Sequence, residues 1–175
     1  MDYGVILYLD TKSNNYINDL RYKICNNGVN KHTIDSGIKP HITLASFESK
    51  DIFNFIEKLK IFLKYEKAFE VEFNSIGIFP FKENVVYLSP VMNMELYGIH
   101  NRFYSFFKNH NLKYGDYYLP EKWVPHCTVA SRLDINEVIS SITTIKEEFK
   151  VFSSLVKYVG VIQGEPPKEI ACIKL

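Results

Sequence analysis

The sequence predicts an α+β fold built from a duplicated unit, because strand-like and helix-like patterns alternate and their order repeats. The segment PHITLAS at residues 40–46 recurs as PHCTVAS at residues 125–131, with five identities and an offset of 85 residues. Each copy precedes a capped amphipathic helix and then a strand with a glycine between apolar neighbours, Gly77 in one half and Gly160 in the other. The order strand, helix, strand, strand therefore occurs twice.

The first half begins with the apolar run YGVILYL at residues 3–9, which predicts a buried strand. Apolar residues then recur at helical spacing between a cap at Thr11 or Ser13 and a stop at Gly28. A polar loop leads to a second strand over 41–47. The patterns that follow predict a helix capped by Ser49 with apolar residues from 52 to 63, and strands over 69–79 and 84–90 joined by a turn at 80–83.

The second half repeats this succession of patterns. Apolar spacing predicts a helix over 96–107, and clustered aromatic and turn residues predict a loop over 114–123. A strand over 126–131 follows, and then a helix capped by Asp134 with apolar residues to 145. Two closing strands are expected over 151–161 and 169–175, separated by the turn GEPP at 164–167.

With 175 residues, 46% of them hydrophobic, the chain suits one globular domain over 1–175. The repeat gives approximate lobes of 1–92 and 93–175, between which the terminal strands are free to cross. A net charge of +1 argues against binding duplex DNA, and no uncharged apolar run approaches the roughly 20 residues of a membrane span. Three cysteines without CxxC spacing argue against a disulfide framework or a cysteine-rich zinc site. We therefore expect a cytoplasmic protein, and we expect a monomer.

The repeated segments place histidine and threonine side chains together. Residues two apart on a strand project to the same face, so His41 pairs with Thr43 and His126 pairs with Thr128. The residues between and after them, such as Cys127, face the core. If a pseudo-twofold relates the two halves, the two imidazoles and two hydroxyls converge on one cleft.

This set of groups suits a phosphate ester. Threonine hydroxyls donate hydrogen bonds to non-bridging oxygens, one imidazole accepts a proton from water, and the other donates a proton to the leaving oxygen. The chemistry needs neither a metal nor a covalent nucleophile, so no cofactor is expected.

The paired Pro-His-x-Thr-aliphatic segments resemble the two-histidine (2H) phosphoesterase superfamily, which includes 2′-5′ RNA ligase-like proteins and 2′,3′-cyclic nucleotide phosphodiesterases. The resemblance implies two pseudo-symmetric lobes of antiparallel-rich sheet, with helices outside and a central cleft. It also implies catalytic roles for His41 and His126, phosphate binding by Thr43 and Thr128, and a nucleotide or RNA end with a cyclic phosphate as partner. In several members the second histidine positions the water and the first serves the leaving oxygen, which would assign these roles to His126 and His41.

Further substrate-binding candidates flank the motifs. Aromatic rings near the second motif either stack on a base or pack against the lobe, and nearby cations either add charge to the phosphate site or are solvated. The facing of Tyr8 is not fixed by the sequence. The candidates are Tyr8, Lys39, Tyr118, Lys122, Trp123 and Arg132.

The same residues are compatible with other roles. A lone histidine beside a proline is usually structural, but two in matching contexts favour a shared site. Zinc would need three or four ligands, and Cys127 points away from His126, so no metal site is expected. An enzyme of this fold acting on a different phosphoester, or a binding module without turnover, remains an alternative.

Overall fold

The computed structural model describes residues 2–80 and 83–175. The predicted turn at 80–83 includes residues 81 and 82, which lie outside the described residues. The elements are, in chain order, β1 (Asp2–Tyr8), α1 (Thr11–Asn26), α2 (His32–Asp35), β2 (His41–Glu48), α3 (Ile52–Leu63), β3 (Phe69–Phe79), β4 (Asn84–Pro90), α4 (Met94–Phe107), β5 (Lys113–Tyr114), the 3-10 turn η1 (Asp116–Tyr118), β6 (Cys127–Leu133), α5 (Ile135–Glu148), β7 (Phe152–Val156), β8 (Tyr158–Gln163) and β9 (Lys168–Lys174).

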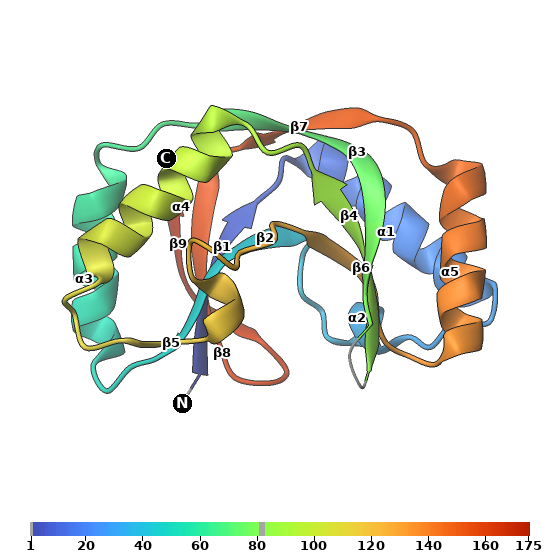
Figure 1. Ribbon diagram of the computed structural model, residues 1–175, viewed down its shortest axis with the longest axis horizontal. Coiled ribbons are helices and arrows are strands. Elements are labelled where there is room, and N and C mark those ends of the chain that lie inside the picture. The colour runs from blue at the N-terminus through green and yellow to red at the C-terminus, as the bar shows by residue number, and fades with distance from the viewer. Residues whose placement is uncertain (1, 81–82) are drawn as a thin grey trace.

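These strands form two antiparallel sheets, which confirms the α+β prediction. Sheet A has the order β5-β2-β1-β8-β9, and sheet B has the order β6-β4-β3-β7. Helices α3 and α4 cover the outer side of sheet A, and α1 and α5 cover the outer side of sheet B (Figure 1). The residues that alternate with the motif side chains face these helices, because Ile42 and Cys127 are both fully buried. The motif strands therefore turn their histidine faces away from the helices.

The sheets do not divide the chain into its two sequence halves. Strands β8 and β9 join β1 in sheet A, while α1 from the first half packs with α5 against sheet B. Each lobe of the structure thus contains segments from both ends of the chain (Figure 1).

The prediction of a single strand over 151–161 was wrong. Val156 pairs with Phe69 in sheet B, whereas Tyr158 pairs with Tyr8 in sheet A, so the chain changes sheets at Lys157. Both β7 and β8 are apolar and extended, and the apolar periodicity of a segment does not indicate which strand it pairs with.

The two repeats have equivalent places in the sheets. In sheet A, Ile6 pairs with Thr43 on one side and Gly160 on the other. In sheet B, Tyr87 pairs with Thr128 on one side and Gly77 on the other. The glycine that follows each repeat therefore lies two strands from the threonine of the other repeat, and the arrangement is the same in both sheets, which supports the duplication.

Two helix caps differ from those predicted. Asp10 rather than Thr11 or Ser13 caps α1, because its Oδ1 accepts the Ser13 N–H at 2.9 Å. Asp51 rather than Ser49 caps α3, by accepting the Asn54 N–H at 3.1 Å.

Asp134 caps α5 as predicted, in a reciprocal capping box with Glu137. Within the described residues, no helix has both the length and the apolar character required to cross a bilayer.

Candidate active site

A cavity of about 520 Å³ opens where the motif strands β2 and β6 approach each other. His41 and Thr128 line it together with His126, which immediately precedes β6. Thr43 does not line it, but its side chain shares a hydrogen bond with Tyr118, which does. The structure thus brings both imidazoles and one threonine to one cavity, and connects the other threonine to it through a tyrosine.

Both imidazoles are oriented in the same way. His41 Nδ1 lies 2.7 Å from the Lys39 carbonyl oxygen, and His126 Nδ1 lies 2.8 Å from the Val124 carbonyl oxygen. Because a carbonyl only accepts, each Nδ1 carries the proton and donates it. In the neutral tautomer each Nε2 is then an unprotonated acceptor, free to take a proton from a ligand.

Burial makes both histidines reluctant to protonate. It lowers the pKa of His41 to about 4, and the charges of Arg21 and His126 add to this, while the hydrogen bond to Lys39 opposes it. Burial also lowers the pKa of His126, against the opposing hydrogen bond to Val124. Both imidazoles are therefore neutral at pH 7 in the free protein, and a bound anion would favour protonation of one of them.

Aromatic rings hold His126 in place. The Phe79 ring meets the imidazole edge-on at a centroid distance of 4.8 Å, and the Tyr87 ring lies 5.3 Å away. Phe79 and Tyr87 in turn stack on each other at 4.3 Å. These rings belong to β3 and β4, so sheet B positions the histidine of the second motif.

The segment between β5 and β6 packs against the first motif and hydrogen-bonds to it. Trp123 is buried, stacks on His100 at 3.9 Å, and donates from Nε1 to the Thr43 carbonyl at 3.0 Å. His100 Nε2 contacts the Tyr118 carbonyl at 3.0 Å. Trp123 therefore packs against the lobe instead of lining the cavity, whereas Tyr118 and Lys122 do line it.

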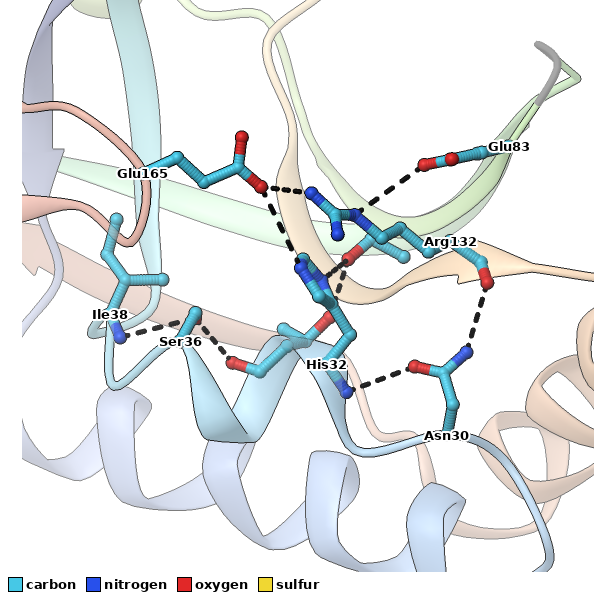
Figure 2. A network of polar contacts seen from close by, with 9 residues as sticks. Asn30, His32, Ser36, Ile38, Glu83, Arg132 and Glu165 are labelled. Carbon is cyan, nitrogen blue, oxygen red and sulfur yellow. Dashed lines mark hydrogen bonds and ion pairs between the residues drawn. The ribbon is translucent and has the colours of Figure 1, made fainter.

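A polar network lies at the rim of the cavity. Arg132 pairs with Glu83 at 3.6 Å and also with Glu165 of the β8–β9 turn, whose carboxylate lies 4.0 Å from His32 Nε2 (Figure 2). His32 Nδ1 contacts the Ser131 hydroxyl at 3.1 Å. The guanidinium of Arg132 is thus engaged by two carboxylates in this structure.

Tyr8 and Lys39 line a second cavity of about 440 Å³ together with Lys157 and Tyr158. The Lys39 ammonium lies 5.6 Å from the centre of the Tyr8 ring, and the Tyr8 hydroxyl donates to Glu169. Because Tyr8 pairs with His41 across the β1–β2 ladder, the second cavity lies beside the first motif.

A sequence profile of the 2′-5′ RNA ligase superfamily matches residues 9–165. The chain belongs to the 2′-5′ RNA ligase superfamily. The match covers both repeats and confirms the resemblance to the 2H phosphoesterases, and it identifies a phosphoesterase- or RNA ligase-like protein. A search of the curated proteins found no significant match.

Solved structures share the fold of this superfamily member. TT0787 of Thermus thermophilus superposes with a TM-score of 0.66 at 11% identity, covering 100% of this chain and 98% of that one. E. coli LigT complexed with 3′-AMP gives a TM-score of 0.66 at 13% identity, covering 99% and 97%. Kluyveromyces marxianus Usb1 with uridine monophosphate gives 0.50 at 10% identity, covering 99% and 96%. The whole chain therefore adopts the LigT-like fold.

Sequence reasoning missed several lining residues of this family member, above all Arg21. Arg21 is 3% exposed and lies on the buried face of α1 with Ile17 and Ile24. A charged residue on that apolar face was the available signal. No comparable sequence signal marks His32 and Glu165, since they lie in a short helix and a turn that are far apart in the sequence. Among the described residues, no group of three or more His, Cys, Asp or Glu side chains is arranged to hold a metal ion.

Proposed function

We propose that the protein is a metal-independent phosphoesterase that opens 2′,3′-cyclic phosphates at RNA ends or on small nucleotides. The observation that carries the proposal is the shared cavity of His41 and His126, each with Nδ1 held by a carbonyl and Nε2 left for the substrate. Two such imidazoles around one phosphate form an acid–base pair.

The reaction balances with these groups alone. One neutral imidazole takes a proton from water as the water oxygen forms a bond to phosphorus. The bond from phosphorus to the 3′ oxygen breaks, and the second imidazole, protonated, delivers its proton to that oxygen. The product is a 2′-phosphate with a free 3′ hydroxyl, and proton exchange with solvent restores both imidazoles. If a 5′ hydroxyl takes the place of the water, the same step forms a 2′-5′ linkage and frees the 3′ hydroxyl, which is ligation without ATP.

The threonines hold the phosphate in this proposal. Thr128 lines the cavity and donates to a non-bridging oxygen. Thr43 acts next to Tyr118, whose pKa burial raises, so that the phenol remains a protonated donor at neutral pH. Lys122, on the cavity wall, is the remaining nearby cation from the sequence candidates.

The nucleoside part of the substrate has room on either side of the phosphate. Apolar and aromatic residues of the first cavity, among them Phe79 and Tyr117, suit a base. A longer RNA end continues toward the second cavity, where Tyr8 and Lys39 would contact the neighbouring nucleotide. LigT with 3′-AMP and Usb1 with uridine monophosphate support a nucleotide as the ligand class.

The test is to incubate the protein in EDTA with 2′,3′-cyclic AMP and with an RNA oligonucleotide bearing a cyclic end, and to follow the products by ³¹P NMR. We expect the 2′-monophosphate in both cases. Binding of 2′-AMP without any turnover would instead indicate a binding module. Turnover of a different cyclic or nucleotide phosphoester alone would indicate an enzyme of this fold with another substrate.

A further inference from the structure

Arg21 is a buried cation, and no acid in the described part of the chain pairs with it. It is 3% exposed, lines the cavity of the two histidines, and has no carboxylate within ion-pair distance among the described residues. Its Nε is buried without a hydrogen-bond partner in the part of the chain that the structure describes. Burying a charge without a counter-charge is costly, so either the site gains an anion or the cation serves another purpose.

The hydrogen bonds of Arg21 connect the two motif segments. Nη2 donates to the Thr128 carbonyl at 2.7 Å, within the second motif. Nη1 donates to the Ile38 carbonyl at 3.0 Å, three residues before His41, and to Asn18 Oδ1 at 3.2 Å. One rigid guanidinium thus bridges two segments that lead into different sheets, and so fixes the spacing between the motifs.

The sequence-predicted cations that the structure describes near the site are less suited to supply a fixed charge to a phosphate. Arg132 is engaged by two carboxylates, and Lys39 lines the second cavity. Lys122 lines the first cavity but is exposed. Arg21 combines a fixed position with a charge that acts in a poorly solvated environment, where electrostatic attraction is strongest.

We propose that Arg21 is a positioning residue that ties both motifs together and supplies the permanent positive charge behind the bound phosphate. This inference deepens the proposed function and rests on the same cavity. The charge also reaches the first motif, since Arg21 contributes to keeping the pKa of His41 low. An arriving phosphate would offset the charge of Arg21 and so make protonation of an imidazole easier.

Two substitutions separate the charge from the bridge. Arg21→Gln removes the charge and leaves one shorter amide donor, whereas Arg21→Lys keeps the charge but cannot form the two-pronged bridge. The matched control is Lys23→Gln, which removes one charge from the exposed side of the same helix, where Lys23 pairs with Glu148. Circular dichroism and the melting temperature establish that each variant is folded.

The readouts are the Kd of inorganic phosphate and the NMR titration of the histidine ring protons, followed by kcat on 2′,3′-cyclic AMP. We expect Arg21→Gln to weaken phosphate binding by about tenfold or more, because a charge-assisted attraction is lost. It should also raise the titration midpoint of His41, because the repulsion between the guanidinium and the protonated imidazole is lost. Arg21→Lys should keep phosphate binding within about threefold but lower kcat by about tenfold or more, because the spacing of the motifs relaxes. Lys23→Gln should change neither.

Unchanged phosphate Kd and unchanged His41 titration in folded Arg21→Gln would overturn the inference. If Arg21→Gln does not fold, Arg21→Lys provides the test. A wild-type kcat in that variant would overturn the inference that Arg21 bridges the two motifs. Phosphate binding and histidine titration need no turnover. Arg21-dependent phosphate binding in a protein that leaves every cyclic phosphate intact would therefore reject the proposed function while supporting the role of Arg21.

Discussion

At the scale of single residues, the chemistry depends on where two imidazole protons are. A backbone carbonyl two residues earlier fixes the proton on Nδ1 of both His41 and His126. Burial then withholds a second proton from each ring. Both imidazoles of the free protein are therefore neutral at pH 7, and the acid form of one imidazole depends on the substrate anion.

This difference between the empty and occupied site predicts histidine titrations. In the free protein, His41 and His126 should titrate below the ordinary value of about 6.5, with His41 near 4. Saturation with inorganic phosphate should raise at least one midpoint, because an anion favours the charged imidazole. The ring protons report this by NMR. Midpoints at or above 6.5 without phosphate would contradict the assignment.

The same shift connects His41 to stability. Its folded pKa of about 4 lies below its unfolded value of about 6.5, so between these values the unfolded chain binds more protons. Protonation therefore removes stability as the pH falls through this window. Above it the histidine is neutral in both states and contributes no pH dependence.

The threonines predict a smaller effect on turnover. Thr128→Val and Thr43→Val should each lower kcat/KM by an amount equivalent to about 1–3 kcal/mol. Thr128→Val removes a hydroxyl from the cavity, and Thr43→Val removes the hydroxyl bonded to Tyr118, which lines the cavity. Tyr118→Phe keeps the ring and frees the Thr43 hydroxyl, so it should cost less than Thr43→Val. Wild-type kcat/KM in both valine variants would show that the threonines serve only the strands.

Single residues were predicted well where strand geometry alone decides their facing. Because side chains alternate between the two faces of a strand, Ile42 and Cys127 were predicted to face the core, and both are buried there. This alternation gave no information on Arg21, because its partners at Ile38 and Thr128 are set by packing between distant segments. The burial of Trp123 likewise depends on His100, which the sequence does not place beside it.

At the scale of elements, the repeated glycines make room for tyrosine rings. A Cβ added at Gly77 would lie 2.3 Å from the Tyr87 ring, and one at Gly160 would lie 2.6 Å from the Tyr8 ring. Tyr87 also packs on His126, whereas Tyr8 reaches toward the second cavity. Equivalent glycines therefore make room for tyrosines at different positions of their strands: Tyr87 supports the second-motif imidazole, whereas Tyr8 supports a neighbouring surface.

This arrangement predicts that two equivalent substitutions differ in effect. Gly77→Ala and Gly160→Ala should each destabilise the protein by about 1–3 kcal/mol through crowding. Only Gly77→Ala should also lower kcat on cyclic AMP markedly, because the displaced Tyr87 presses on His126. Urea unfolding and turnover of both variants check this. Equal kcat losses at equal stability would contradict a specific role of Tyr87.

The elements themselves were predictable from local signals, and the connections between them were not. Apolar spacing located α3 and α5 closely, since a capped amphipathic helix is encoded within its own residues. The split of 151–161 into β7 and β8 depends on pairing with Phe69 and Tyr8, which lie far away in the chain. Asp10 explains part of this break, because its side chain caps α1 and also accepts the Leu155 N–H at 2.8 Å.

At the scale of the whole molecule, the lobes are interwoven. In sheet A, β1 from the first half pairs with β8 from the second half. In sheet B, α1 from the first half covers strands that come mostly from later in the chain. Neither half of the sequence therefore contains a complete lobe, although the repeat suggests a division near residue 92. The duplication is visible in the sequence, but the exchange of elements between lobes is a property of long-range pairing.

The interweaving predicts that the halves do not fold alone. Fragments 1–92 and 93–175, produced separately, should show little cooperative unfolding by circular dichroism, because sheet A lacks β8 and β9 in one and β1 and β2 in the other. Mixing them should restore at least part of the cooperative transition. Two independently cooperative fragments would contradict this account of the fold.

The most direct test of the acid–base pair is the single-turnover rate on 2′,3′-cyclic AMP for the wild type, His41→Ala, His126→Ala and the double variant, each checked for native circular dichroism. Two groups that act on one phosphate as a unit should not be additive. We expect each single variant to be slower by roughly 10²-fold or more, and the double variant to be hardly slower than either. Wild-type rates in one single variant would contradict the pairing of the two imidazoles.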